Sequence, residues 1–223
     1  MSGADPQPLW LDARDADGAR GAVILLHGLG ANHEDLVPLA DGVSPDCRDR
    51  LTFVVPRAPL RRITIAGGLT VPAWFDIHTY GDNGEEDWRG LDETRAALDA
   101  LLKTLARRGL PPERVVIGGF SQGGAAALHY LCRNPNALRG VFVLSGWLPR
   151  GEQLPPSPRT PVLLVHGRLD LTLPVHYARL SRHRLEEAGF RVEWHEHARL
   201  GHSVDAKVLA VLSQWLDGLF GAD

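Results

Sequence analysis

Short apolar runs recur along this chain of 223 residues, and glycine, proline or charged residues bound most of them. The runs are apolar at most successive positions, which is typical of strands that are buried on both faces of a parallel sheet. The pattern predicts strands over residues 22–26, 51–55, 114–120, 140–144, 161–166 and 191–197.

Between these runs lie segments whose apolar residues repeat at the spacing of a helix. The clearest has leucines at positions 91, 98, 101, 102 and 105, which fall on one stripe of a helix that Gly109 and Pro111 then end. Further helices are predicted over residues 122–132, 174–188 and 203–219. Strands that alternate with helices indicate an α/β fold, with a mostly parallel central sheet and helices on both faces.

The chain length is compatible with one domain over residues 1–223, in which residues 1–20 form an N-terminal extension or an edge strand. Residues 66–90 are predicted to be one long loop, and loops of that length tend to be functional. Its aromatic residues either line a pocket or cover the sheet; they are Trp74, Phe75, Tyr80 and Trp88.

Charge and hydropathy narrow the classes of partner. The 24 Lys and Arg residues are scattered and do not exceed the 27 Asp and Glu residues, which disfavours nucleic-acid binding. Because no apolar run approaches the roughly 20 residues that cross a bilayer, no transmembrane helix is expected. No secretory leader is visible at the N-terminus, so we expect a cytoplasmic protein whose two cysteines are free thiols.

The motif G-x-S-x-G occurs at residues 119–123, between a predicted strand and a predicted helix. A sharp turn between these elements strains the backbone of Ser121, and Gly119 and Gly123 leave room for it because they have no Cβ. The motif alone also fits an ordinary glycine-rich junction. Its position between a strand and a helix favours Ser121 as a nucleophile.

A serine nucleophile needs a base, and the base needs a carboxylate that orients it. Asp170 follows the predicted strand 161–166, and His202 lies in the loop before the last predicted helix. Ligand sites of open α/β sheets lie at the carboxyl ends of the strands. The chain order Ser, Asp, His is also the order used by α/β-hydrolases, so we interpret Ser121, Asp170 and His202 as a catalytic triad.

Two backbone N–H groups are candidates for an oxyanion hole. The first is that of Gln122, at the start of the helix behind Ser121. The second is that of Leu29, in the His-Gly loop that follows the strand 22–26. By itself this loop is an ordinary connection between a strand and a helix. The triad residues elsewhere in the sequence favour its assignment to an oxyanion hole.

These residues belong to a wider set of short motifs at positions 27–32, 56–59, 74–76, 119–124, 144–149, 166–170 and 201–202. Together they resemble the phospholipase/carboxylesterase family, which includes acyl-protein thioesterases and small bacterial carboxylesterases. The resemblance implies an α/β-hydrolase fold with Ser121, Asp170 and His202 as the triad and Leu29 and Gln122 as the oxyanion hole. It further implies hydrolysis of a small-molecule ester or thioester without a cofactor or metal, often by a homodimer.

The expected activity is that of a serine carboxylesterase acting on short- to medium-chain esters through an acyl-enzyme. Acyl-protein thioesterase and lysophospholipase activities are alternatives, although the moderate apolar content of residues 60–70 disfavours long-chain acyl-protein substrates. Trp74 and Trp147 are candidate substrate-binding residues, or else core aromatics. A catalytically silent binding protein and a metal-dependent hydrolase that uses the histidines are the rivals from other classes.

Overall fold

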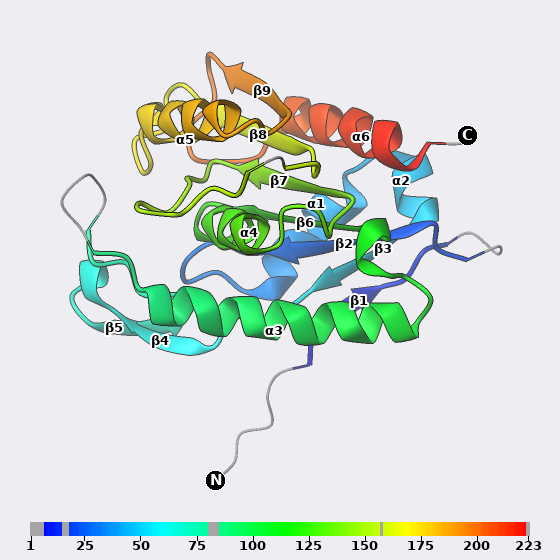
Figure 1. Ribbon diagram of the computed structural model, residues 1–223, viewed down its shortest axis with the longest axis horizontal. Helices are drawn as coiled ribbons and strands as arrows, with labels where there is room; N and C mark the ends of the chain where they lie inside the picture. The colour runs from blue at the N-terminus through cyan, green and yellow to red at the C-terminus, as the bar shows by residue number, and fades with distance from the viewer. Residues whose placement is uncertain (1–6, 15–17, 80–84, 157, 222–223) are drawn as a thin grey trace, which may run out of the picture.

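A computed structural model describes residues 7–14, 18–79, 85–156 and 158–221. Its centre is a seven-stranded sheet with the order β1-β3-β2-β6-β7-β8-β9, parallel except for the antiparallel pair of β1 and β3 (Figure 1). The mostly parallel sheet predicted from the sequence is confirmed. The strands are β1 (Leu9–Leu11), β2 (Gly21–Leu26), β3 (Leu51–Val55), β6 (Val115–Phe120), β7 (Gly140–Leu144), β8 (Val162–Gly167) and β9 (Val192–His197).

Helices cover both faces of the sheet (Figure 1). On one face lie α3 (Trp88–Arg107), α4 (Gln122–Arg133) and α5 (Val175–Glu187), and on the other lie α1 (Val37–Asp41), α2 (Pro45–Arg50) and α6 (Ala206–Phe220). The 3-10 turns are η1 (His33–Leu36), η2 (Thr64–Ala66) and η3 (Pro112–Arg114).

Strand β2 shows why the apolar runs are continuous. Ala22, Ile24 and Leu26 pack into the core on the α3–α4 face, and Val23 and Leu25 pack into the core on the α6 face. Because successive side chains of a strand point to opposite faces, a strand buried on both faces has no solvent-facing positions, and most of its residues are apolar.

The prediction of one long loop over residues 66–90 is wrong at both ends. Strands β4 (Leu60–Ile63) and β5 (Leu69–Pro72) form a separate antiparallel hairpin, and α3 begins at Trp88. The hairpin is largely exposed and lies outside the main sheet, so its sequence lacks the apolar run of a buried strand. Tyr80, which the prediction included, lies outside the described residues.

At the N-terminal side, Leu9–Leu11 forms the edge strand β1, while residues 1–6 and 15–17 lie outside the described residues. Among the helices that the structure describes, none is long and apolar enough to cross a membrane. The carboxyl ends of the parallel strands meet at one edge of the sheet, where the loops that follow β2, β6, β7, β8 and β9 lie together.

Candidate active site

Ser121 lies between the end of β6 and the start of α4, with a backbone φ of 54° and ψ of −117°. A positive φ is uncommon for a residue with a side chain, so the turn around Ser121 is strained. A Cβ added to Gly119 would lie 2.4 Å from the carbonyl carbon of Gly123, and one added to Gly123 would lie 2.1 Å from the oxygen of Leu26. Only glycine fits at these two positions, as the motif predicts.

The side chains of Ser121, His202 and Asp170 are brought together from three separate loops. The Nε2 atom of His202 is 3.0 Å from the Ser121 hydroxyl, and its Nδ1 atom is 2.7 Å from Oδ2 of Asp170. Since an ionised carboxylate only accepts hydrogen bonds, Nδ1 carries the proton and Nε2 is free to accept the serine proton. The imidazole ring also packs against Phe120 at a centroid distance of 4.7 Å.

Asp170 is buried, and its carboxylate is held on both oxygens. Oδ1 accepts hydrogen bonds from the backbone N–H groups of Thr172 and Leu173 at 3.0 and 2.8 Å. Oδ2, which accepts from His202, also lies 3.3 Å from Nε2 of the buried His166. These contacts fix the carboxylate toward the imidazole and satisfy a group that would be costly to bury alone.

The two backbone donors predicted for an oxyanion hole lie on the loop after β2 and at the start of α4. A Cβ added to Gly28 would lie 3.6 Å from the Cβ of Ser121, so the loop that carries Leu29 runs beside the serine. Gln122 is the first residue of α4. Within the described residues neither N–H donates to another protein group.

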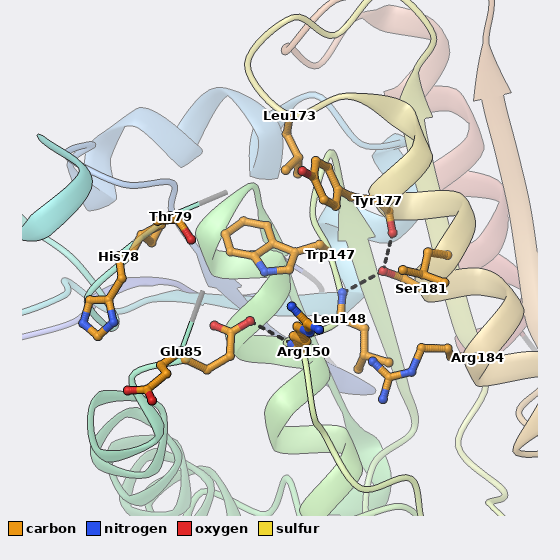
Figure 2. Close-up of a pocket in the computed structure, with 13 residues that line it drawn as sticks. His78, Thr79, Glu85, Trp147, Leu148, Arg150, Leu173, Tyr177, Ser181 and Arg184 are labelled. Carbon is orange, nitrogen blue, oxygen red and sulfur yellow. Dashed lines mark hydrogen bonds between the residues drawn. The ribbon is translucent and has the colours of Figure 1, made fainter. Parts of the chain in front are cut away.

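Trp74 and Trp147 occupy different environments. Trp74 is 3% exposed and packs in the core, where its ring lies 5.0 Å from the ring of His27. Trp147 is half-buried and lines a cavity, with Leu173 and Tyr177 on one side of its ring and Arg150 and Arg184 on the other (Figure 2).

The space between the residues that line this cavity amounts to about 690 Å³, a volume that includes open solvent at its mouth. It borders the loops that carry Ser121 and Asp170, because Leu173 in its wall donates to Asp170 and Trp147 directly follows Gly146. A Cβ added to Gly146 would lie 2.9 Å from the carbonyl oxygen of Ser121. Sequence reasoning did not single out Tyr177, Arg150 and Arg184, which meet here only in the fold.

Two further histidines, His27 and His166, lie close to the site, and burial lowers the pKa of both side chains. The Nε2 atom of His27 accepts a hydrogen bond from the N–H of Ala58, and its Nδ1 lies 2.8 Å from the carbonyl of Gly28. Nδ1 therefore carries the single proton. Within the described residues, no group of three or more His, Cys, Asp or Glu is arranged to hold a metal ion.

Comparison with known proteins finds a matching family model and similar sequences. The family model described as Phospholipase/Carboxylesterase matches residues 13–219. An acyl-protein thioesterase 1 from Yarrowia lipolytica is 32% identical over 204 residues, covering 87% of this chain and 90% of the relative.

Solved structures with a similar fold include two plant proteins. The acyl-protein thioesterase 2 of Zea mays has a TM-score of 0.83 at 27% identity, over 96% of this chain and 99% of that one. The Arabidopsis thaliana protein SOBER1 has a TM-score of 0.83 at 28% identity, over 90% and 99%. These similarities extend over nearly the whole fold.

Proposed function

The chain belongs to the phospholipase/carboxylesterase family of carboxylic-ester hydrolases, and we propose that it is a serine carboxylesterase with Ser121, His202 and Asp170 as its triad. The observation that carries the proposal is the pair of contacts made by His202. One imidazole nitrogen lies 3.0 Å from the serine hydroxyl and the other 2.7 Å from a buried carboxylate.

In the proposed reaction, the Ser121 oxygen attacks the carbonyl carbon while His202 takes the hydroxyl proton at Nε2. The electron pair of the carbonyl double bond moves to its oxygen, giving a tetrahedral oxyanion. When this collapses, the bond to the alcohol or thiol breaks, and His202 returns the proton to the leaving group. A water molecule activated by His202 then releases the acid from the acyl-enzyme.

Asp170 orients the imidazole and stabilises it when it becomes positively charged. The backbone N–H groups of Leu29 and Gln122 donate to the oxyanion. Donors that are already in place stabilise this charge without reorganisation during the reaction, and a single such donor is worth on the order of a hundredfold in rate.

For the substrate, we propose short- to medium-chain acyl esters whose acyl group enters the cavity beside Trp147. Its apolar wall is formed by Ile77, Trp147, Leu148 and Leu173, and its rim carries charged side chains. An apolar pocket of limited size favours chains that it can bury completely. The names of the relatives favour acyl thioesters as a second substrate class, since thioesters pass through the same oxyanion.

Replacement of the nucleophile tests this proposal. We expect Ser121→Ala to lower kcat for p-nitrophenyl butyrate by a factor on the order of a million, to the background rate. A fluorophosphonate probe should label the wild type and leave Ser121→Ala unlabelled. Ser213→Ala is the control, because this serine lies in α6 and its hydroxyl bonds to the carbonyl oxygen of Leu209 and the N–H of Ser44. Hydrolysis by Ser121→Ala within tenfold of the wild type would contradict the assignment.

Substrate class is tested by matched series of p-nitrophenyl esters and acyl thioesters, from about two to about sixteen carbons. We expect kcat/KM to reach its maximum at short or medium chains and to fall beyond it, because longer chains exceed the cavity. A rate that still increases at the longest chains would contradict the proposed cavity as the acyl site.

A further inference from the structure

The segment Pro72–Phe75 runs between the two parts of the candidate oxyanion site and forms hydrogen bonds to both. It begins at the last residue of β5 and carries Trp74 into the core. In the sequence, Trp74 lies 47 residues from His27 and 48 from Gln122. The fold alone therefore brings the three residues together.

On one side, this segment holds the loop that carries Leu29. The indole N–H of Trp74 donates to the carbonyl oxygen of His27 at 2.8 Å. The carbonyl oxygen of Pro72 accepts a hydrogen bond from the N–H of Gly30, also at 2.8 Å. The segment thus contacts the loop on both sides of Leu29 and restricts rotation of its peptide units.

On the other side, the same segment binds the side chain of Gln122. The backbone N–H of Trp74 donates to Oε1 of Gln122 at 3.1 Å, and Nε2 of Gln122 donates to the carbonyl oxygen of Phe75 at 2.7 Å. Gln122 is completely buried, so these two bonds satisfy an amide that has no water around it. The residue that supplies one backbone donor is therefore fixed by its own side chain.

The segment is itself anchored from behind. The hydroxyl of Thr94 in α3 donates to the carbonyl oxygen of Trp74 at 2.5 Å, and the N–H of Ala73 donates to the carbonyl oxygen of Pro59. Trp74 thus has its N–H, its carbonyl and its indole N–H all engaged. A residue that is held at three points can keep the groups that it contacts at a fixed distance from one another.

We propose that Trp74 is a positioning residue that sets the separation between the N–H groups of Leu29 and Gln122. This inference rests on the proposed function, since it needs an oxyanion to be stabilised. Donors stabilise the oxyanion only when they lie about 2.7–3.1 Å from it, so a small shift of the loop weakens the transition state. The ground-state carbonyl carries less charge, and substrate binding is affected less.

Trp74→Phe tests the role of Trp74, because it removes the indole N–H and keeps an aromatic ring. We expect kcat for p-nitrophenyl butyrate to fall about tenfold while KM stays within about twofold. An alkyl trifluoromethyl ketone adds reversibly to serine and places an oxyanion in the same position. Its inhibition constant should rise by about the same factor as kcat falls, and fluorophosphonate labelling should persist.

Trp215→Phe is the matched control, because it removes the same N–H from a buried tryptophan on the opposite face of the sheet. It should leave kcat and the inhibition constant unchanged. Should Trp74→Phe fail to fold, Thr94→Val is used in its place, because it removes only the donor to the Trp74 carbonyl. We then expect kcat to fall about threefold and the inhibition constant to rise by the same factor.

An unchanged inhibition constant in Trp74→Phe overturns the proposal, whether or not kcat falls, and so does a change confined to KM. Comparison of Ser121→Ala with Trp74→Phe separates failure of this inference from failure of the proposed function. If Ser121→Ala abolishes hydrolysis and Trp74→Phe behaves like the wild type, only the role of Trp74 is wrong. Activity that survives in Ser121→Ala removes the basis of both.

Discussion

His166 lies beside the proposed triad, and its protonation decides which groups it can bond. Its Nε2 atom lies 2.8 Å from the carbonyl oxygen of Leu173 and 3.3 Å from Oδ2 of Asp170, and both are acceptors. Nε2 therefore carries the proton. Burial lowers the pKa of His166, so the ring is neutral, and its Nδ1 is buried without a hydrogen-bond partner. The N–H of His166 thus donates to the carbonyl oxygen of Leu173, and the ring lies beside the carboxylate oxygen that accepts from His202.

Removal of this donor should loosen Leu173, whose N–H holds Oδ1 of Asp170, and so impair the carboxylate that contacts His202. We expect His166→Leu to lower kcat/KM about tenfold, and the acid limb of its pH profile to move to higher pH. The limb moves because Oδ2 then interacts more strongly with the positively charged form of His202. The measurement is kcat/KM for p-nitrophenyl butyrate between pH 5 and pH 9.

His166→Gln is the matched variant, because its side-chain amide can donate from a position close to Nε2. It should keep most of the activity and leave the acid limb in place. If both variants lose the same activity with no movement of the limb, His166 acts only through the packing of its loop.

The sequence singled out the residues that belong to a motif and missed those that are linked only by contacts in the fold. Ser121 has glycines at fixed spacing, and Asp170 and His202 follow it in a known order. The link from Trp74 to Gln122 has no such pattern, since its bonds join backbone and side-chain atoms of distant segments. The sequence left open whether Trp74 binds the substrate or packs in the core, and the structure places it in the core.

At the scale of elements, the junction of β6 and α4 leaves no room for a side chain at Gly123. Gly123 lies against the carbonyl oxygens of Leu26 and His27, and these belong to backbone that cannot move without displacing β2. Gly218, in α6, has open space where a Cβ would lie. The two glycines thus differ in what an added methyl group would meet.

A pair of alanine variants tests this difference. We expect Gly123→Ala to lower the free energy of unfolding by at least about 2 kcal/mol and to remove most activity, because the methyl group overlaps backbone atoms. Gly218→Ala should raise the free energy of unfolding by about 0.5–1 kcal/mol, since alanine favours a helix. Urea unfolding gives both values. A Gly123→Ala variant as stable as the wild type would contradict the tight contact.

Elements were predictable where burial on both faces imposes an apolar run. The parallel strands β2, β3, β6, β7 and β8 meet this condition. Every residue of these strands is buried except the last residue of β6. The hairpin of β4 and β5 is exposed at Leu60 and Leu69 and pairs only with itself. Hydrogen bonds between its two strands, and not an apolar core, define it, and such pairing leaves little trace in a hydropathy pattern.

At the scale of the whole molecule, two buried histidines make stability depend on pH. Burial lowers the pKa of both His27 and His166 below the ordinary value of 6.5. The unfolded chain therefore binds these protons at a higher pH than the folded chain does. As pH falls below about 6.5, protonation favours the unfolded state, and stability is lost.

We expect the urea midpoint of the wild type to fall between pH 7.5 and pH 5.5. Each buried histidine contributes up to about 1.4 kcal/mol for every pH unit below its unfolded pKa. Burial raises the pKa of Glu86, which has the opposite effect, so the comparison must be made between variants. His166→Gln should show a shallower loss, because one of the two histidines no longer titrates.

His183→Gln is the control, because this histidine is exposed on α5 and pairs only with Glu187. Its midpoint should change with pH as in the wild type. An equal pH dependence in His166→Gln and the wild type would mean that His166 takes up its proton without opening the fold. The loop that holds Asp170 would then have to admit a charged imidazole, which conflicts with the burial of both side chains.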